Sequence, residues 1–255
     1  YLADAPEFPE DRVDYGRVIP WKLALLDRAF DRMRSNPPEG APERFVSFRR
    51  AQGGWLEDYA LFMALKEAQG GGPWADWPAP LRHRRPSAVA EARRTLAPEV
   101  DRQAFRQFLF FDQWHRLREQ AHRRGLQILG DAPFYVADDS ADVWAHPGLF
   151  ELDDDLRPTV VAGVPPDFFT AGGQLWGNPL YCWEQHAADG FAWWISRLQA
   201  LLQQSDLVRI DHFRAFVDFW AVPAGSPTAA EGRWVPGPGA AFFLRAQEAL
   251  GGLPI

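Results

Sequence analysis

The chain has 255 residues, 47% of them hydrophobic, and a formal net charge of −7. The hydrophobic fraction is sufficient for a sizeable core, and the acidic balance argues against a general nucleic-acid or membrane-surface binder. The single cysteine, Cys182, excludes an intrachain disulfide and favours a reducing, cytoplasmic compartment. No apolar run approaches the roughly 20 residues of a membrane span. Because the first residue is Tyr1 rather than Met, the sequence leaves open whether a signal or transit peptide precedes it.

Helical patterns dominate the first half of the chain. Residues 1–19 are rich in acids and proline, which predicts a loop. Pro20 fits the first turn of a helix, and this helix is expected to end at the proline-rich segment 36–42. A second helix over 55–69 ends at the Gly70–Pro73 run, and five arginines in 82–94 predict a solvated helix face. A long helix follows over 105–124, with Gly125 as its C-terminal stop.

The pattern then changes to helices followed by short apolar strands. A strand over 126–129 leads to Asp131, and a helix over 191–202 leads to a second strand over 207–210 and Asp211. A helix followed by a strand with an acid at its carboxyl end is the unit of a parallel α/β barrel. Residues 131–190 are loop-like, and long connections at this face of a barrel carry the sites of such enzymes.

The stretch VRIDHFRAF, residues 208–216, contains a candidate catalytic carboxylate, Asp211. Side chains alternate along a strand, so Arg209 and Asp211 point the same way. A guanidinium beside a carboxylate favours its charged form, which a carboxylate nucleophile needs. A structural ion pair between the two residues is the alternative reading.

Three long motifs lie in order along the chain and carry a resemblance. They are GDAPFYVADDSADVWAHP at 130–147, VVAGVPPDFFTAGGQLWGNPLYCW at 160–183 and VRIDHFRAF, preceded by WLEDYALFMALK at 55–66 and PWADWP at 73–78. The chain resembles the amylomaltase, or bacterial 4-α-glucanotransferase (disproportionating enzyme), family. The resemblance implies an α/β fold: part of a TIM (β/α)8 barrel of the α-amylase type with helical insertions. Residues 1–255 would form the central part of that barrel, 36–100 a mainly helical insertion, and 163–173 a lid within the loop region 131–190.

The resemblance also implies roles for individual residues. Asp211 falls on the nucleophile that forms a covalent glycosyl-enzyme, and Arg209 on the arginine that orients it. His212 falls on a residue that binds sugar hydroxyls, and Asp131 on the acid that supports Arg209. The remaining positions are a loop over the site and the acceptor-side contacts: Asp167, Phe168 and Phe169, then Gln174 and Trp176. No metal or other cofactor is implied.

Several expectations have alternatives. For Asp131, the alternative is a helix N-cap. For Phe168 and Phe169, the alternative is a core staple in place of a lid hinged at Gly163 and Gly172–Gly173. The acids at 138, 139 and 142 resemble a cation site but lack an EF-hand glycine and glutamate, so capping and surface roles are expected for them.

The function implied is transfer of α-1,4-glucan segments between malto-oligosaccharides by a retaining mechanism. The resemblance covers all of this chain but about half of the family's length, so the general acid/base Glu is expected after Ile255 and the chain alone is expected to be inactive. An α-glucan hydrolase on the same barrel and a non-catalytic glucan-binding remnant remain alternatives. Donor length, cyclisation, oligomeric state and thermal stability are not indicated by the sequence.

Overall fold

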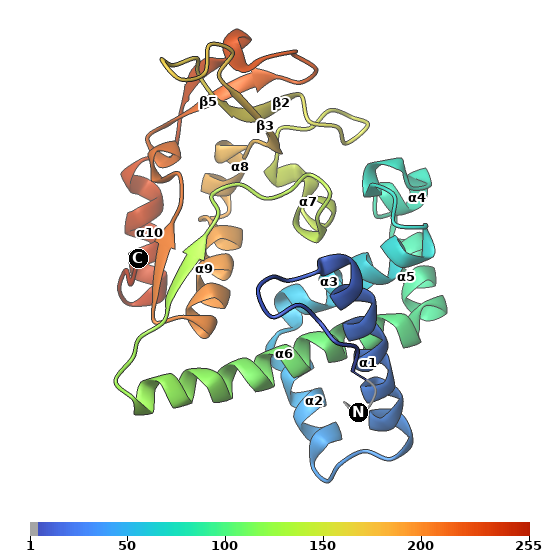
Figure 1. Ribbon diagram of the computed structural model, residues 1–255. Helices are drawn as coiled ribbons and strands as arrows, with labels where there is room; N and C mark the ends of the chain where they lie inside the picture. Colours follow the sequence, from blue (N-terminus) through green and yellow to red (C-terminus); the bar gives the residue numbers. More distant parts are fainter. Residues whose placement is uncertain (1–4) are drawn as a thin grey trace. The chain divides into compact units, whose positions relative to one another are not determined.

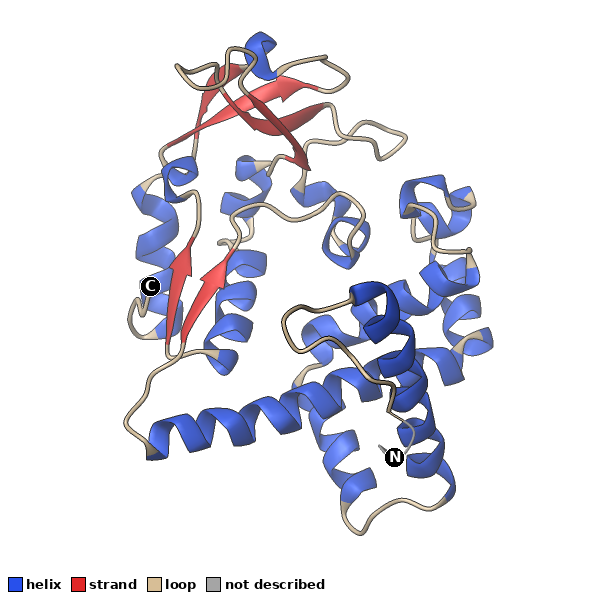
Figure 2. Cartoon of the chain, viewed as in Figure 1, coloured by secondary structure: helices blue, strands red, loops and turns tan. Residues whose placement is uncertain are grey.

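The computed structural model describes residues 5–255, which divide into two compact units (Figure 1). The first comprises Tyr1–Leu65 and Ala92–Asp112, and the second comprises Lys66–Glu91 and Gln113–Ile255. Figure 2 shows helices alone in the first unit and both helices and strands in the second. The chain is therefore a mixed α/β protein.

The first unit consists of helices packed through aromatic side chains. Its helices are α1 (Tyr15–Ser35), α2 (Ala41–Ala51), most of α3 (Gly53–Ala68) and parts of α5 (Pro86–Thr95) and α6 (Ala97–Arg123). Phe30, Phe105 and Phe108 are buried together, and Phe45 and Phe48 of α2 pack against them. No separate helix was predicted at α2 within the helical insertion, because the prolines before and at its start indicate a turn.

Helix α1 begins five residues earlier than the position of Pro20 suggested. Asp14 caps it by accepting a hydrogen bond from the Arg17 amide at 3.3 Å. Pro20 thus lies inside the helix, where its missing N–H and its ring are normally unfavourable. The expectation of a loop up to residue 19 was wrong from Tyr15 onward, and residues 1–4 lie outside the described part.

The arginine-rich segment is less solvated than predicted. It forms α4 (Ala79–Arg82), a turn and then α5. Arg84 lies over the Trp144 ring at 4.1 Å, and Arg93 donates to Asp58 at 3.0 Å. These guanidinium groups hold elements together, so a plain solvent-facing role was wrong for them.

In the second unit, two parallel strands lie side by side with α9 (Ala192–Gln204) and α10 (Ala240–Leu250) beside them (Figure 1). Strand β1 (Leu129–Ala132) pairs with β4 (Leu207–Ile210), and Asp131 lies opposite Arg209. The β4 prediction is confirmed. β1 starts three residues later than predicted, and Asp131 lies within it, so the N-cap alternative for Asp131 was wrong.

A second sheet is antiparallel and has the strand order β3-β2-β5-β6. Its strands are β2 (Val160–Val164), β3 (Gln174–Pro179), β5 (Asp218–Pro223) and β6 (Arg233–Pro236). Residues 131–190 are therefore not a plain loop, since besides β2 and β3 they contain α7 (Ala141–Ala145) and α8 (Trp183–Ala188). Both sheets are open, so the partial barrel stays a prediction, as do the domain boundaries.

The core of the second unit is aromatic. The largest side chains that are fully buried in it include Trp144, Trp194, Phe216 and Phe242. Of the twelve tryptophans, four are buried (Trp74, Trp77, Trp144 and Trp194), and Trp176 and Trp234 are exposed. Across residues 5–255, no helix is both long enough and apolar enough to cross a membrane.

Candidate active site

Asp131, Arg209 and Asp211 meet at the carboxyl ends of β1 and β4. Arg209 donates from Nε to Asp131 Oδ1 at 2.9 Å and from Nη2 to Asp131 Oδ2 at 2.7 Å, a bidentate pair across the parallel register. The same Nη2 lies 3.7 Å from Asp211 Oδ1. The Asp211 amide donates to Ala132 O at 2.9 Å, which continues the strand pairing to this residue.

The electrostatics of the group follow from this pairing. The hydrogen bonds from Arg209 lower the pKa of Asp131, and those bonds raise the pKa of Arg209. All three side chains are more than half exposed. The guanidinium is therefore fixed by Asp131 and keeps its charge beside the Asp211 carboxylate, which is free to face a ligand.

His212 and Trp176 form one wall next to Asp211. His212 has a left-handed backbone at φ 50°, a rare conformation for a residue with a side chain. Its ring lies edge-on to Trp176 with the ring centroids 4.9 Å apart. Trp176 Nε1 in turn donates to Gln174 Oε1 at 3.0 Å. The structure thus brings His212, Trp176 and Gln174 into one connected set.

Burial governs the charge state of His212. It lowers the pKa of the imidazole, and the nearby Arg214 acts in the same direction while Asp211 opposes them. The ring is thereby biased toward its neutral form, which offers one N–H donor and one acceptor nitrogen. A neutral ring of this kind suits hydrogen bonding to sugar hydroxyls.

The loop between β2 and β3 carries the two exposed phenylalanines. Phe168 and Phe169 expose 97% and 90% of their surface, so the core-staple alternative was wrong. Asp167 accepts hydrogen bonds from the amides of Phe169 at 2.9 Å and Thr170 at 2.7 Å. Its carboxylate therefore shapes the turn that presents the rings. Within residues 5–255, the two phenylalanine rings contact each other, and neither residue is hydrogen-bonded to Asp211.

The base of this loop is fixed by close glycine contacts. A Cβ at Gly163, inside β2, would lie 2.6 Å from Gln174 O. At Gly173, which has φ +68°, it would lie 2.3 Å from Val164 O. Gly163 is therefore a packed strand residue and not the hinge that the sequence suggested. At both ends of the loop, the backbone is packed too closely to admit a side chain.

The sequence reading missed two residues of this site. Tyr135 is 8% exposed, its ring contacts those of both Trp176 and His212, and its hydroxyl has no hydrogen-bond partner among the described residues. Asn178 donates from Nδ2 to Val136 O at 2.8 Å and ties β3 to the segment after β1. The alternation Gln174, Trp176, Asn178 along one strand face was a signal that could have found Asn178.

The arrangement suits carboxylate chemistry. Among the residues that the structure describes, no group of three or more His, Cys, Asp or Glu side chains is placed to hold a metal ion. Asp139, one of the acids weighed for a cation, pairs with Lys66 and accepts from the Trp74 amide. An exposed carboxylate beside an arginine meets one of the two requirements of retaining glycosyl transfer, the nucleophile, and leaves the acid/base to be supplied by another residue.

Comparison with known proteins identifies the family. The family model described as 4-alpha-glucanotransferase matches residues 2–255. The chain belongs to the 4-alpha-glucanotransferase family. The 4-alpha-glucanotransferase of Thermus thermophilus is 52% identical over 98% of this chain, and that of Synechocystis is 48% identical over 100% of it. The amylomaltase of Streptococcus agalactiae, solved in complex with acarbose, superposes with a TM-score of 0.90 at 38% identity over 95% of this chain.

The family resemblance predicted from the motifs is thus confirmed, and with it the family-level expectation of a 4-alpha-glucanotransferase. The chain spans about half the length of these relatives: 50% of the Thermus enzyme, 51% of the Synechocystis enzyme and 49% of the Streptococcus chain. The amylomaltase neighbour adds support for the α/β architecture.

Proposed function

We propose that a protein containing this chain transfers α-1,4-glucan segments between malto-oligosaccharides through a covalent glycosyl-enzyme, on a barrel of which this chain forms part. The observation that carries the proposal is the bidentate Arg209–Asp131 pair, which holds a guanidinium 3.7 Å from the Asp211 carboxylate. Family membership supports the substrate class. We also infer a cytoplasmic location from the single cysteine.

In the proposed first step, an oxygen of Asp211 attacks the anomeric carbon of the donor. The bond from that carbon to the leaving sugar oxygen breaks, and an acid gives this oxygen a proton. In the second step an acceptor hydroxyl attacks the same carbon, releases Asp211 and gives up its proton to that acid, now a base. Arg209 places its positive charge beside Asp211, and His212 and Trp176 contact the sugar.

The acid/base must lie roughly 5 Å from the nucleophile in a retaining enzyme. Asp131 does not suit this role because Arg209 lowers its pKa, whereas an acid needs a raised one. We infer that the acid is the Glu expected in the part of the family's length that this chain does not span. We therefore expect activity in a protein of full family length, not in residues 1–255 alone.

The substitution Asp211→Asn tests the nucleophile in a protein of full family length that contains this sequence. The amide keeps the shape but cannot attack, so turnover should fall by at least about 10⁴-fold while glucan binding changes little. Intact-mass and peptide mass spectrometry after reaction with an α-glucosyl fluoride should place the sugar on Asp211 of the unsubstituted protein, with fluoride released.

Asp218→Asn is the matched control, because Asp218 pairs with Arg214 and not with Arg209. It should keep turnover within about tenfold of the unsubstituted protein. A label on a residue other than Asp211 would refute the assignment. Glucose release without redistribution of maltotriose would favour the hydrolase, and binding without either activity would favour the glucan-binding remnant.

A further inference from the structure

The turn that follows Asp211 is held by backbone contacts from a distant segment. Residues Phe213–Phe216 form a short 3-10 helix, η3, and Val217 ends it. The Gly237 amide donates to Val217 O at 2.8 Å, and the Gly239 amide donates to Phe216 O at 2.7 Å. The segment after β6 therefore binds the turn that follows the proposed nucleophile.

Gly237 makes this approach possible. A Cβ at this position would lie 2.4 Å from Ala215 O, 2.5 Å from Phe216 O and 2.6 Å from Phe216 C. All three are backbone atoms of the turn, so they cannot swing aside as a flexible side chain can. The backbone at Gly237 is not in the left-handed region. The glycine is required by the close approach alone.

Aromatic contacts from α10 support the same turn. Phe242 stacks on Phe216 with centroids 4.7 Å apart and planes 8° apart, and both side chains are fully buried. Phe243 lies 5.3 Å from Phe213 and 4.8 Å from Phe216 between ring centroids. Since the Asp211 amide is bonded to Ala132 O, the turn is held at both ends.

We propose that Gly237 is a positioning residue for the Asp211 nucleophile, acting through the η3 turn. The inference rests on the proposed function and adds to it a residue that touches neither the sugar nor Asp211. A side chain at 237 must displace the turn, because normal C···O contacts are longer than 3 Å and the opposing atoms are backbone. Displacing the turn moves Asp211 relative to Arg209 and the sugar.

The test is Gly237→Ala in a protein of full family length that contains this sequence. A displacement near 1 Å can cost about 100-fold in rate, so glycosyl-enzyme formation from α-glucosyl fluoride should slow by about that factor. Binding of a malto-oligosaccharide should stay within about threefold, because the sugar contacts are not removed. This split between rate and binding is a readout that a loss of folded protein alone would not give.

Gly148→Ala is the matched control, because Gly148 has nothing within 4 Å of a built Cβ and no positive φ. It should label Asp211 at the rate of the unsubstituted protein. Labelling of Gly237→Ala at that same rate would overturn the positioning role. If neither the unsubstituted protein nor Gly148→Ala labels at all, the proposed function fails instead.

A second variant keeps the proposal testable if Gly237→Ala does not fold. Phe243→Leu removes the ring contacts with Phe213 and Phe216 from a half-buried position and keeps an apolar side chain. It should fold and slow labelling by about 3- to 10-fold with binding unchanged. An unchanged labelling rate in folded Phe243→Leu would overturn the proposal.

Discussion

Phe168 and Phe169 place two large apolar rings almost wholly in water. Burying one phenylalanine side chain is worth roughly 1.5–3 kcal/mol, so a loop that closes over a bound sugar gains free energy that the open loop lacks. Asp167 shapes the turn and leaves the rings outermost. These residues therefore suit the exclusion of water from a glycosyl-enzyme, a step that distinguishes transfer from hydrolysis.

Phe169→Ser in a protein of full family length should raise the ratio of hydrolysis to transfer more than it lowers donor cleavage. The reason is that the ring excludes water and is remote from bond breaking. Because 90% of the ring is exposed, the free energy of unfolding should change by no more than about 0.5 kcal/mol. Glucose release and chain redistribution from maltotriose measure the ratio.

The control for this variant is Leu117→Ser, which removes an exposed apolar side chain from α6. It should leave the ratio unchanged. Equal loss of both activities in Phe169→Ser, together with a marked fall in Tm, would contradict the lid.

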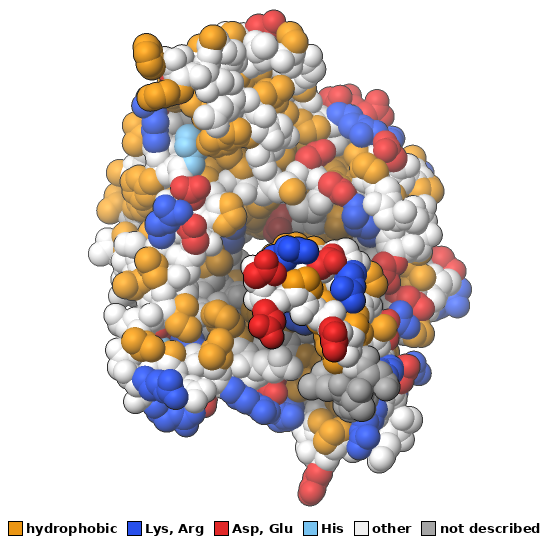
Figure 3. All heavy atoms as spheres, in the orientation of Figure 1, with side chains coloured by type: hydrophobic (Ala, Val, Ile, Leu, Met, Phe, Trp, Pro, Cys, Tyr) orange, Lys and Arg blue, Asp and Glu red, His pale blue; other side chains and the backbone are white. Residues whose placement is uncertain are grey.

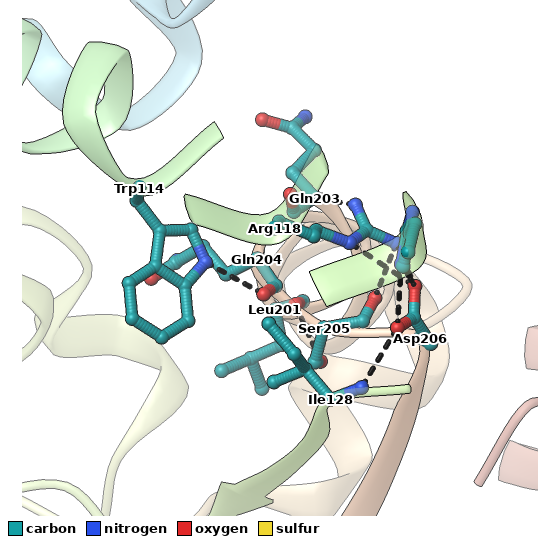
Figure 4. Close-up of polar contacts among 9 residues, drawn as sticks. Trp114, Arg118, Ile128, Leu201, Gln203, Gln204, Ser205 and Asp206 are labelled. Carbon is teal, nitrogen blue, oxygen red and sulfur yellow. Dashed lines mark hydrogen bonds and ion pairs between the residues drawn. The ribbon is translucent and has the colours of Figure 1, made fainter. Parts of the chain in front are cut away.

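At the scale of secondary-structure elements, Asp206 joins α6 to the start of both parallel strands (Figure 4). It accepts from the Ile128 amide at 2.8 Å, from Arg118 Nε at 3.1 Å and from His122 Nε2 at 2.9 Å. Trp114 Nε1 donates to Gln204 O nearby at 2.7 Å. These bonds hold the pKa of Asp206 well below its usual range, first through the Ile128 amide and then through Arg118.

Asp206→Asn should lower Tm by several degrees at pH 7, since one of its oxygens becomes an amide that faces donors. A lowered carboxyl pKa contributes stability that is present above the unfolded pKa of about 3.9 and is lost as the pH falls below it. The difference in Tm between the two proteins should therefore shrink below pH 4. Thermal melts from pH 7 to pH 3 measure it, with Asp155→Asn, an exposed acid, as control.

The secondary-structure elements differ in how well they could be predicted from the sequence. α9 was predictable because its apolar residues recur at helical spacing, and β4 because it is a short apolar run followed by an acid. The antiparallel sheet was not, because Gly163 adds no side chain to the apolar pattern of β2 and because β2 pairs with β5, which lies far along the chain. At the site, strand alternation predicted Arg209 beside Asp211, and the family resemblance implied that Asp131 supports Arg209. Arg209 makes its hydrogen bonds to Asp131 and lies only within ion-pair distance of Asp211, because the strand register places Asp131 and Arg209 opposite each other.

At the scale of the whole molecule, charged side chains of both signs are interspersed on the surface, and a histidine lies in the aromatic core. On the face drawn in Figure 3, Lys and Arg side chains alternate with Asp and Glu. His186 is fully buried, packs against Tyr181 and Trp183, and neither of its ring nitrogens makes a well-formed hydrogen bond. Burial lowers its pKa to about 4.

Acid should therefore destabilise the protein before its carboxyls titrate. The unfolded imidazole takes a proton near pH 6.5, whereas the folded one resists until about pH 4, so stability is complete above pH 6.5 and falls between these values. The loss amounts to roughly 3 kcal/mol. His186→Phe should flatten Tm between pH 6.5 and 4.5, and His83→Phe is the exposed control. Parallel pH profiles for the two variants would contradict this.

The tight packing of Gly163 and Gly173 also sets the reach of the loop between them. Phe168 is four residues from Val164 and Phe169 is four from Gly173, and an extended chain covers at most about 3.5 Å per residue. The Cα atoms of the two phenylalanines can therefore lie no farther than about 14 Å from the two ends of the loop, and each ring extends a little beyond its Cα. If the loop closes over Asp211, this limited reach would shelter few sugar units, and the rest of a long glucan would stay in solvent. Lengthening this loop should therefore change how many sugar units are sheltered, without any change at Asp211 itself.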